Sequence, residues 1–212
     1  MRNSKRDWNA LIFKKLKSYR LKFVRYISTF IGKLNLSLRK IEYGEKIEFY
    51  GKSYFFRAPS SIIRIGHHVA FRSDKTSNQI GLMRRCIVST LVENAQIIIG
   101  NNSGFSGVSI FAAKKISIGS NVMIGANCLI TDTNWHNIAP EMRHLSDTNP
   151  GEINIGNNVF IGYGCVILKN VSIGDNTVIG AGSVVASNIP KNVIAVGNPC
   201  RVIKILKMRG AE

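Results

Sequence analysis

Apolar residues recur every six positions over the C-terminal part of this 212-residue chain. A small or β-branched residue usually follows four positions later, and glycine often follows directly. This spacing fits neither the two-residue alternation of a half-buried strand nor the helical period of about 3.6 residues. The unbroken series of aliphatic positions is Ile155, Ile161, Ile167, Ile173, Ile179 and Val185. An earlier run of the same form is Ile118, Ile124 and Ile130, and looser copies are Ile65 and Phe71, and Ile99, Phe105 and Phe111.

A six-residue period predicts a parallel β-helix, in which three hexads close one triangular coil. Successive coils stack about 4.8 Å apart, as neighbouring strands do in a sheet. The aliphatic residue then points inward and the small residue fits the narrow interior, while glycine tolerates tight corners. The spacing predicts two coils over residues 155–190, one over residues 118–135, and about two weaker coils before them.

The first forty residues follow a different pattern. Apolar residues from Trp8 to Leu34 recur at helical spacing, which predicts an amphipathic helix, either continuous or broken near Gly32. Residues 1–40 carry twelve Lys or Arg and one acid, so they hold +11 of the net charge of +17. Two interpretations stay open: packing of the helix against its own β-helix or a neighbouring subunit, or docking of residues 1–35 on an anionic membrane surface. Guidance of an acidic polysaccharide by the positive field is a related alternative. We expect no nucleic-acid partner, because no nucleic-acid motif accompanies the charge.

These patterns divide the chain into three parts. Residues 1–40 form a basic amphipathic helical segment, residues 41–205 a β-helix domain, and residues 206–212 a tail. With neither a signal peptide nor a membrane-spanning run in the sequence, we expect a cytoplasmic protein, peripheral to the inner membrane face if the helix docks there. No cysteine or histidine group has zinc-ligand spacing, so we expect no metal and four buried thiols, at Cys86, Cys128, Cys165 and Cys200.

The six-residue period breaks between Ile130 and Ile155, where 25 residues separate two aliphatic positions. The intervening stretch is polar, contains Pro140 and Pro150, and has no repeat. It predicts a loop over residues 131–154 that protrudes from the coils, the usual place for functional groups on a rigid scaffold. Its first residues read TDTNWHN and contain His136.

The stretch IGNNVFIGYGCVILKNVSIGDNTVIGAGSVVASNIPKNVIAVGNPCRVIK resembles the C-terminal half of the maltose, galactoside and capsule-sugar O-acetyltransferases. These are hexapeptide-repeat acyltransferases, and the resemblance extends over about residues 60–205. It implies an all-β fold, a left-handed parallel β-helix, here preceded by the helical segment. It also implies a homotrimer that binds acetyl-CoA between subunits and transfers the acetyl group directly to a carbohydrate acceptor.

By position, His136 matches the catalytic base of the resembled enzymes. A neutral imidazole can accept the proton of an attacking sugar hydroxyl near neutral pH. The sequence leaves open whether Asp132, Glu141, or Ser103 and Ser106 hold the other ring nitrogen. Trp135 either walls the acceptor pocket or anchors the loop. The residues that we expect to contact the acceptor are Asp132, Trp135, Ser106 and Arg143.

The resemblance also implies a set of acetyl-CoA contacts. Small residues let the pantetheine arm approach the backbone, and cations bind the phosphates. The family commonly has Thr-Lys where this chain has Ala186-Ser187, so phosphate binding depends more on the other cations. The residues carried over are Gly162, Tyr163, Ala181, Ala186, Ser187, Arg201 and Lys204.

The favoured function is O-acetylation of a sugar hydroxyl in a bacterial surface polysaccharide or its precursor. N-acetylation of an amino sugar or small xenobiotic is the alternative within the same enzyme class. A non-catalytic β-helix scaffold is a further alternative, although it would need neither the histidine loop nor the GNPCRVIK terminus. Metal-dependent hydration of carbon dioxide, also found on β-helices, requires three converging histidines, a pattern that this sequence lacks.

Overall fold

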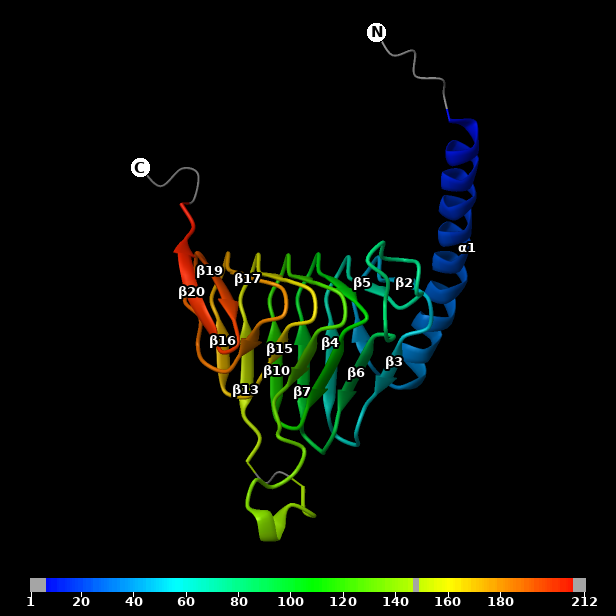
Figure 1. The fold of residues 1–212 in the computed structure, drawn as a ribbon. Helices are drawn as coiled ribbons and strands as arrows, with labels where there is room; N and C mark the ends of the chain where they lie inside the picture. The colour runs from blue at the N-terminus through cyan, green and yellow to red at the C-terminus, as the bar shows by residue number, and fades with distance from the viewer. Residues whose placement is uncertain (1–6, 147–148, 208–212) are drawn as a thin grey trace.

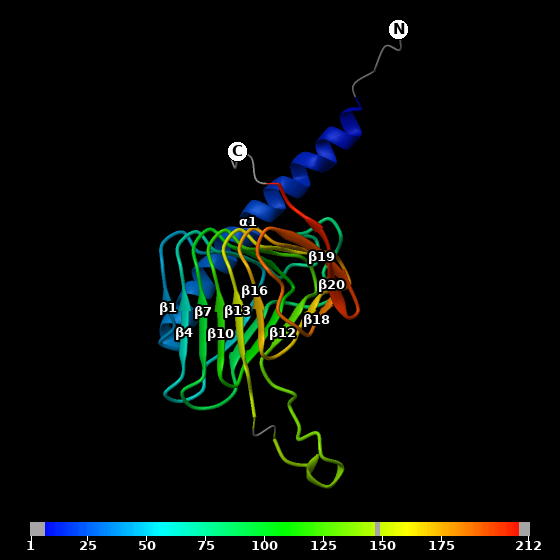
Figure 2. The same ribbon diagram turned by 90° about the vertical axis from the view of Figure 1, so that its left-hand side faces the viewer.

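The computed structural model describes residues 7–146 and 149–207. A three-sided prism of parallel strands forms the body, and the helix α1 (Trp8–Leu38) lies at its N-terminal end (Figures 1 and 2). Each side of the prism is one sheet. We call these sheets A, B and C, and the edges between them the A–B, B–C and C–A edges.

The chain visits the three sheets in turn, so that every third strand returns to the same sheet. Sheet A contains β1 (Glu42–Tyr43), β4 (Ile62–Ile65), β7 (Gln96–Ile99), β10 (Lys115–Ile118), β13 (Glu152–Ile155) and β16 (Val171–Ile173). Sheet B contains β2 (Glu48–Tyr50), β5 (Ala70–Arg72), β8 (Gly104–Ser106), β11 (Met123–Ile124), β14 (Phe160–Ile161), β17 (Val178–Ile179), β19 (Val193–Gly197) and β20 (Cys200–Ile205). Sheet C contains β3 (Tyr54–Phe56), β6 (Ile87–Thr90), β9 (Ser109–Ala112), β12 (Leu129–Thr131), β15 (Val166–Ile167) and β18 (Val184–Val185).

Six complete coils result, and all their strand pairs are parallel. β19 starts a further coil, and β20 turns back antiparallel to it. The β-helix predicted from the hexads is therefore present, but the predicted number of coils before residue 118 was too small. The coil that was missed is the first, whose six-residue positions hold the aromatic residues Tyr43, Phe49 and Phe55. An insertion after β5 also interrupts the period in the second coil.

The inward aliphatic residues stack in register from coil to coil. In sheet B, Ile124 pairs with Ile161, and Ile161 with Ile179. In sheet C, Ile130 pairs with Ile167. All of these side chains are buried, which confirms the role predicted for these positions. In β9 the inward residue is Ile110, and the predicted Phe111 is only partly buried.

Glycine and asparagine have different structural roles at the A–B edge. A Cβ on Gly119 would lie 2.7 Å from the backbone of Gly156 in the next coil, so glycine is required there by close approach. Asparagine residues, rather than glycine, adopt the left-handed backbone conformation there, for example Asn158 at φ 55° and Asn176 at φ 57°. These two side chains also hydrogen-bond to each other between coils, at 3.0 Å.

α1 is a single continuous helix that covers the first coil. Leu36 is fully buried, and the Thr29 hydroxyl accepts a hydrogen bond from the amide of Phe49 in β2. Gly32 does not break the helix, because it lies against the ring of Phe49, where any side chain would overlap that ring. Within the described residues, no helix combines the length and the apolarity needed to span a bilayer.

Two segments leave the coils as loops. One is the predicted loop after β12, whose tip contains the short 3-10 helix η1 (Pro140–Met142) and extends far from the prism (Figure 1). The other lies between β5 and β6, over residues 73–86, and was not predicted. The signal for it was a distance of 17 residues between the inward Phe71 and Val88, where six would continue the period.

A column of aromatic rings fills the interior of the first three coils. Phe49, Phe71 and Phe105 stack with ring centroids 5.5 and 5.1 Å apart, and Phe55 meets the first two edge to face. Rings at these separations contribute packing beyond the area that they bury.

We expect Phe71→Ala to lower the free energy of unfolding by about 3–5 kcal/mol, because it leaves a cavity in the middle of this column. The matched control is Phe56→Ala, since Phe56 points outward and is 47% exposed; it should cost about 1 kcal/mol or less. Urea unfolding followed by circular dichroism measures both, and equal losses would contradict the role of the column.

Candidate active site

The loop that contains His136 is clamped to the C–A edge at its base. The carboxylate of Asp132 accepts hydrogen bonds from the amides of Ala113, Lys114 and Lys115, at 2.6–2.8 Å, in the preceding turn. Its backbone carbonyl accepts the amide of Gly151 at 2.7 Å, which joins the two ends of the loop. Burial raises the pKa of Asp132, and the three amide hydrogen bonds act against that rise.

This geometry corrects one interpretation of the sequence. Asp132 is fully buried and its carboxylate is occupied by backbone amides. Neither holding the imidazole of His136 nor contacting an acceptor fits that environment. Its role is to fix where the loop leaves the coil.

Trp135 fixes the next part of the loop. Its ring meets that of Phe111 in β9 edge to face, at 5.0 Å between centroids, and its amide donates to the Thr133 hydroxyl. The backbone at Trp135 is left-handed, at φ 69°. The anchoring role left open by the sequence is therefore present, while 44% of the residue remains exposed for contact with another molecule.

His136 follows this anchor and is exposed. It pairs across the loop with Ser146 in an antiparallel bridge, and the neighbouring Asn137 amide donates to the carbonyl of Leu145. His136 and Arg143 line one hollow of about 420 Å³, together with Asn134, Asn137 and Ile138. The loop thus brings an imidazole and a guanidinium to the same surface.

The two serines proposed as partners of His136 lie elsewhere. The Ser103 hydroxyl accepts the amide of Val122 at the A–B edge, and Ser103 is buried. Ser106 ends β8 at the B–C edge, where its hydroxyl accepts a hydrogen bond from Asn78 at 3.3 Å. Glu141 lies in η1 at the loop tip and is exposed.

Three of the predicted cofactor residues gather on the B–C edge. Gly162 and Tyr163 follow β14, and Ala181 follows β17 in the next coil. A Cβ on Gly162 would lie 2.5 Å from the Ala181 nitrogen, so coil packing alone explains this glycine. Ala181 is exposed and Tyr163 is partly exposed, so both can contact a ligand.

The other predicted cofactor residues lie toward the C-terminal end of the prism. Ala186 and Ser187 follow β18 at the C–A edge, and both are exposed. Arg201 and Lys204 lie on β20, also exposed, opposite Val196 and Ile194 of β19. Two cations thus stand at the end of the coil stack on sheet B.

Within one chain, the candidate residues lie on two edges of the prism, and Ala186 and Ser187 share the C–A edge with the His136 loop. The His136 loop leaves from the C–A edge, whereas Tyr163 and Ala181 lie on the B–C edge, with sheet C between them. A hollow of about 560 Å³ lies along sheet A and its edges, and it contains none of the candidate residues. The candidate residues of a single chain therefore fall into two separate groups.

The loop over residues 73–86 adds groups to the B–C edge that sequence reasoning missed. The Met83 amide donates to the side-chain oxygen of Asn127, and the Met83 sulfur lies 3.9 Å from the Tyr163 hydroxyl. The side-chain nitrogen of Asn127 is buried and has no hydrogen-bond partner among the described residues. This edge therefore carries a loop as well as the small residues.

All four cysteines are buried free thiols, as predicted. The Cys128 thiol donates to the carbonyl of Gly162 in the next coil, at 3.0 Å. Its neighbour Cys165 and burial together raise the pKa of Cys128, and burial raises the pKa of Cys86. These thiols serve packing. Among the described residues, no group of three or more His, Cys, Asp or Glu side chains could hold a metal ion.

Comparison with known proteins identifies the repeat. Residues 152–187 match the family model described as bacterial transferase hexapeptide (six repeats), and residues 115–131 match the hexapeptide repeat of succinyl-transferase. A search of curated proteins finds no match.

Solved structures extend the likeness to most of the chain. A maltose O-acetyltransferase from Clostridium difficile 630 is 28% identical, with a TM-score of 0.50 over 89% of each chain. A galactoside acetyltransferase in complex with coenzyme A is 30% identical, with a TM-score of 0.51 over 78% of this chain and 65% of that one. This chain thus spans just under two thirds of the galactoside enzyme.

The chain thus contains the repeats of bacterial hexapeptide transferases and is similar to these solved acetyltransferases. A hexapeptide-repeat acetyltransferase from Vibrio cholerae O1 biovar eltor, complexed with acetyl-CoA, shares the fold at 21% identity and a TM-score of 0.56, over 98% of this chain and 93% of that one. The coil stack is thus a fold that this chain shares with that acetyltransferase.

We expect Asp132→Ala to lower the free energy of unfolding of this protein by roughly 2–4 kcal/mol, because three amides lose a charged acceptor. Asp175→Ala is the matched control, since the Asp175 carboxylate accepts the amide of Asn157 at an exposed corner. It should cost about 1 kcal/mol or less. Urea unfolding of both variants tests the clamp, which equal losses would rule out.

Proposed function

We propose that this acyltransferase transfers an acetyl group from acetyl-CoA to a sugar hydroxyl of a bacterial surface polysaccharide or its precursor. The observation that carries the proposal is the exposed His136, held on a loop whose base is clamped by Asp132 and anchored by Trp135. A general base needs such fixed positioning, because proton transfer depends on hydrogen-bond geometry.

In the proposed reaction, His136 accepts the proton of the sugar hydroxyl as its oxygen attacks the thioester carbonyl. A carbon–oxygen bond forms, the carbon–sulfur bond breaks, and the proton on His136 passes to the departing sulfur of coenzyme A. The buried thiols of this chain are packed between coils, so none of them is a suitable nucleophile for a covalent intermediate. Direct transfer between two bound substrates is the proposal that fits these residues.

We further propose that the working unit is a homotrimer with left-handed coils, as in the resembled enzymes. The separation of the two groups of candidate residues across sheet C supports this, because a neighbour could bring its B–C edge to the His136 loop. Cyclic symmetry would create three identical sites in this way. Tyr163, Ala181, Ala186 and Ser187 would then line the pantetheine arm, with Gly162 giving it room.

Acetyl-CoA phosphates would lie near Arg201 and Lys204, which are exposed at the end of the coil stack. Trp135, Arg143 and Ser106 are our proposed acceptor contacts. Arg143 shares the hollow of His136, which suits an acceptor that carries anionic groups.

We expect His136→Ala to retain acetyl-CoA binding and to lose roughly 10²- to 10⁴-fold in turnover, the usual contribution of a general base. His144→Ala is the matched control, because His144 is exposed on the same loop; its turnover should be close to wild type. Release of coenzyme A measures transfer, and isothermal calorimetry measures binding. Turnover of His136→Ala near wild type would eliminate His136 as the base.

We expect Arg201→Ala to weaken acetyl-CoA binding about tenfold, because it removes a charged hydrogen-bond donor from the phosphates. Arg64→Ala serves as the control, since Arg64 is paired with Glu42 at the other end of the coils. Calorimetry with acetyl-CoA and with its 3′-dephospho form identifies which phosphate Arg201 contacts. Unchanged affinity for both forms would remove Arg201 from the site.

A panel of bacterial glycans, assayed with acetyl-CoA, identifies the acceptor. Mild alkaline treatment of the product separates the two transferase alternatives, because an ester is hydrolysed and an amide survives. A lack of any acetyl-CoA binding would favour the scaffold alternative.

A further inference from the structure

The helix α1 packs on the body with its less apolar side. Leu36 is buried, Gly32 lies against Phe49, and Arg25 forms an ion pair with Glu48 at 3.0 Å. These helix residues lie on one side of α1, as their helical spacing requires. The opposite side of α1 therefore points away from the prism.

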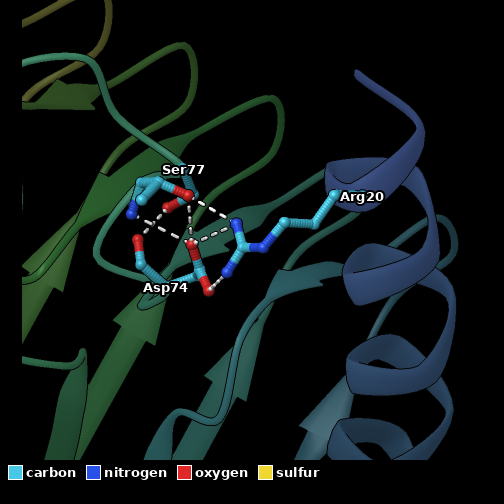
Figure 3. Close-up of polar contacts among 4 residues, drawn as sticks. Arg20, Asp74 and Ser77 are labelled. Carbon is cyan, nitrogen blue, oxygen red and sulfur yellow. Dashed lines mark hydrogen bonds and ion pairs between the residues drawn. The ribbon is translucent and has the colours of Figure 1, made fainter. Parts of the chain in front are cut away.

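A second ion pair fastens α1 where it passes the loop after β5. Arg20 donates to both carboxylate oxygens of Asp74, at 2.8 and 3.2 Å, and to the Thr76 hydroxyl (Figure 3). The Asp74 carboxylate also accepts hydrogen bonds from the amide and the hydroxyl of Thr76. The Arg20 guanidinium holds the pKa of Asp74 below its ordinary value, in opposition to partial burial. The orientation of the helix is thus fixed at both Arg20 and Leu36.

The outward side of α1 is apolar and largely aromatic. Tyr26 is 79% exposed, Phe30 72% and Phe23 66%. From Trp8 to Leu38 the helix spans about 46 Å, at about 1.5 Å per residue. An ordinary protein surface carries single, scattered apolar residues, whereas this apolar stripe follows the helix along its length. Its exposed members are Trp8, Ile12, Phe13, Leu16, Tyr19, Phe23, Tyr26, Ile27, Phe30, Ile31, Leu34 and Leu38.

The charge of the helix has one sign. Trp8–Leu38 contains seven Lys or Arg and no Asp or Glu. Lys15, Lys22 and Lys33 are spaced by seven and eleven residues, which places them along one border of the apolar stripe. Lys22 lies over the ring of Tyr19, 5.9 Å from its centroid, so its stem already follows the apolar surface. Long side chains in this position extend their charged ends past an apolar layer.

We propose that this outward face of α1 docks on an anionic lipid bilayer, with the helix in the plane of the surface. The aromatic and aliphatic side chains enter the boundary between headgroups and acyl chains, and the bordering lysines bind anionic headgroups. This surface is separate from the proposed acyl-transfer residues, so it stands or falls independently of the proposed reaction. It adds membrane docking by the outward side of α1 to the packing of its inward side on the body.

Charge argues against a second copy as the occupant. Two α1 faces in contact would bring lysine borders together, and no acidic side chain from Trp8 to Leu38 could neutralise them. A bilayer with anionic headgroups supplies the opposite charge along the whole stripe. The lipid surface is therefore the better complement.

The test is co-sedimentation of the full chain with vesicles of phosphatidylcholine, alone or mixed with phosphatidylglycerol. We expect binding to the mixed vesicles, weakened by added salt, and little binding to phosphatidylcholine alone. Phe23→Ser with Phe30→Ser should lower the vesicle affinity roughly tenfold or more, because it removes two exposed aromatic anchors. Both side chains are exposed, so the fold and acetyl-CoA binding should be unchanged.

A charge-matched pair of variants isolates the lysine border. Lys15→Gln, Lys22→Gln and Lys33→Gln together should lower the affinity for mixed vesicles roughly tenfold or more. The control, with the same loss of charge, combines Lys46→Gln, Lys75→Gln and Lys191→Gln, which are exposed and lie outside α1; it should bind like wild type.

Three outcomes would overturn the proposal: absence of wild-type binding to mixed vesicles, equal binding by the aromatic variant, or equal effects of the two lysine sets. Light scattering identifies the competing occupant. A fall in assembly mass for the Phe23 and Phe30 variant, without vesicle binding by wild type, would assign the face to a second copy of the chain.

Discussion

The parallel backbone ladder between coils is the constraint on which the rest of the molecule depends. Each coil must repeat the path of the one beneath it at the spacing of neighbouring strands, about 4.8 Å. An inward residue therefore always stacks on its equivalent, as Ile124 does on Ile161 and Ile161 on Ile179. Where coils approach most closely, only glycine fits, as at Gly119 and Gly162.

The same constraint assigns function to the edges. A side chain inside the coils contacts only its neighbours in the stack, so groups that meet substrates must lie at corners or in segments expelled from the coils. Both loops leave at edges, one at the C–A edge and one at the B–C edge. Asp132 shows how an expelled loop is kept in place, because its buried carboxylate is held by the amides of the preceding turn.

The helix α1 has a different role from the coils, because it covers the end of the coil stack. The first coil has no coil beneath it, and Leu36 and Gly32 cover its open end. Covering that end uses only the C-terminal half of the helix and its less apolar side. The longer apolar stripe faces outward, and the ion pairs of Arg20 with Asp74 and of Arg25 with Glu48 hold the helix in this orientation. Capping and the proposed contact with a lipid surface thus fall on opposite faces of one helix.

The sequence predicted part of the candidate site. The break in the period located the loop of His136, and the family resemblance supplied its chemical role. Two misjudged features share one reason. In the sequence, Asp132 is only an acid close to a histidine. Its carboxylate is buried because it accepts hydrogen bonds from three amides of a turn almost twenty residues earlier. The loop over residues 73–86 lies beside Tyr163 and Asn127, contacts between residues 44 and 80 positions apart.

The sequence by itself determined the repeat, the inward residues, the histidine loop and the amphipathic helix, because each of these is a local pattern of side chains. It undercounted the early coils, where phenylalanine and an insertion obscure the period. Only the tertiary structure decided which edge each group of candidate residues occupies and which face of α1 points outward. Those outcomes depend on contacts between distant coils, such as Arg20 with Asp74, and such contacts leave no periodic trace along the chain.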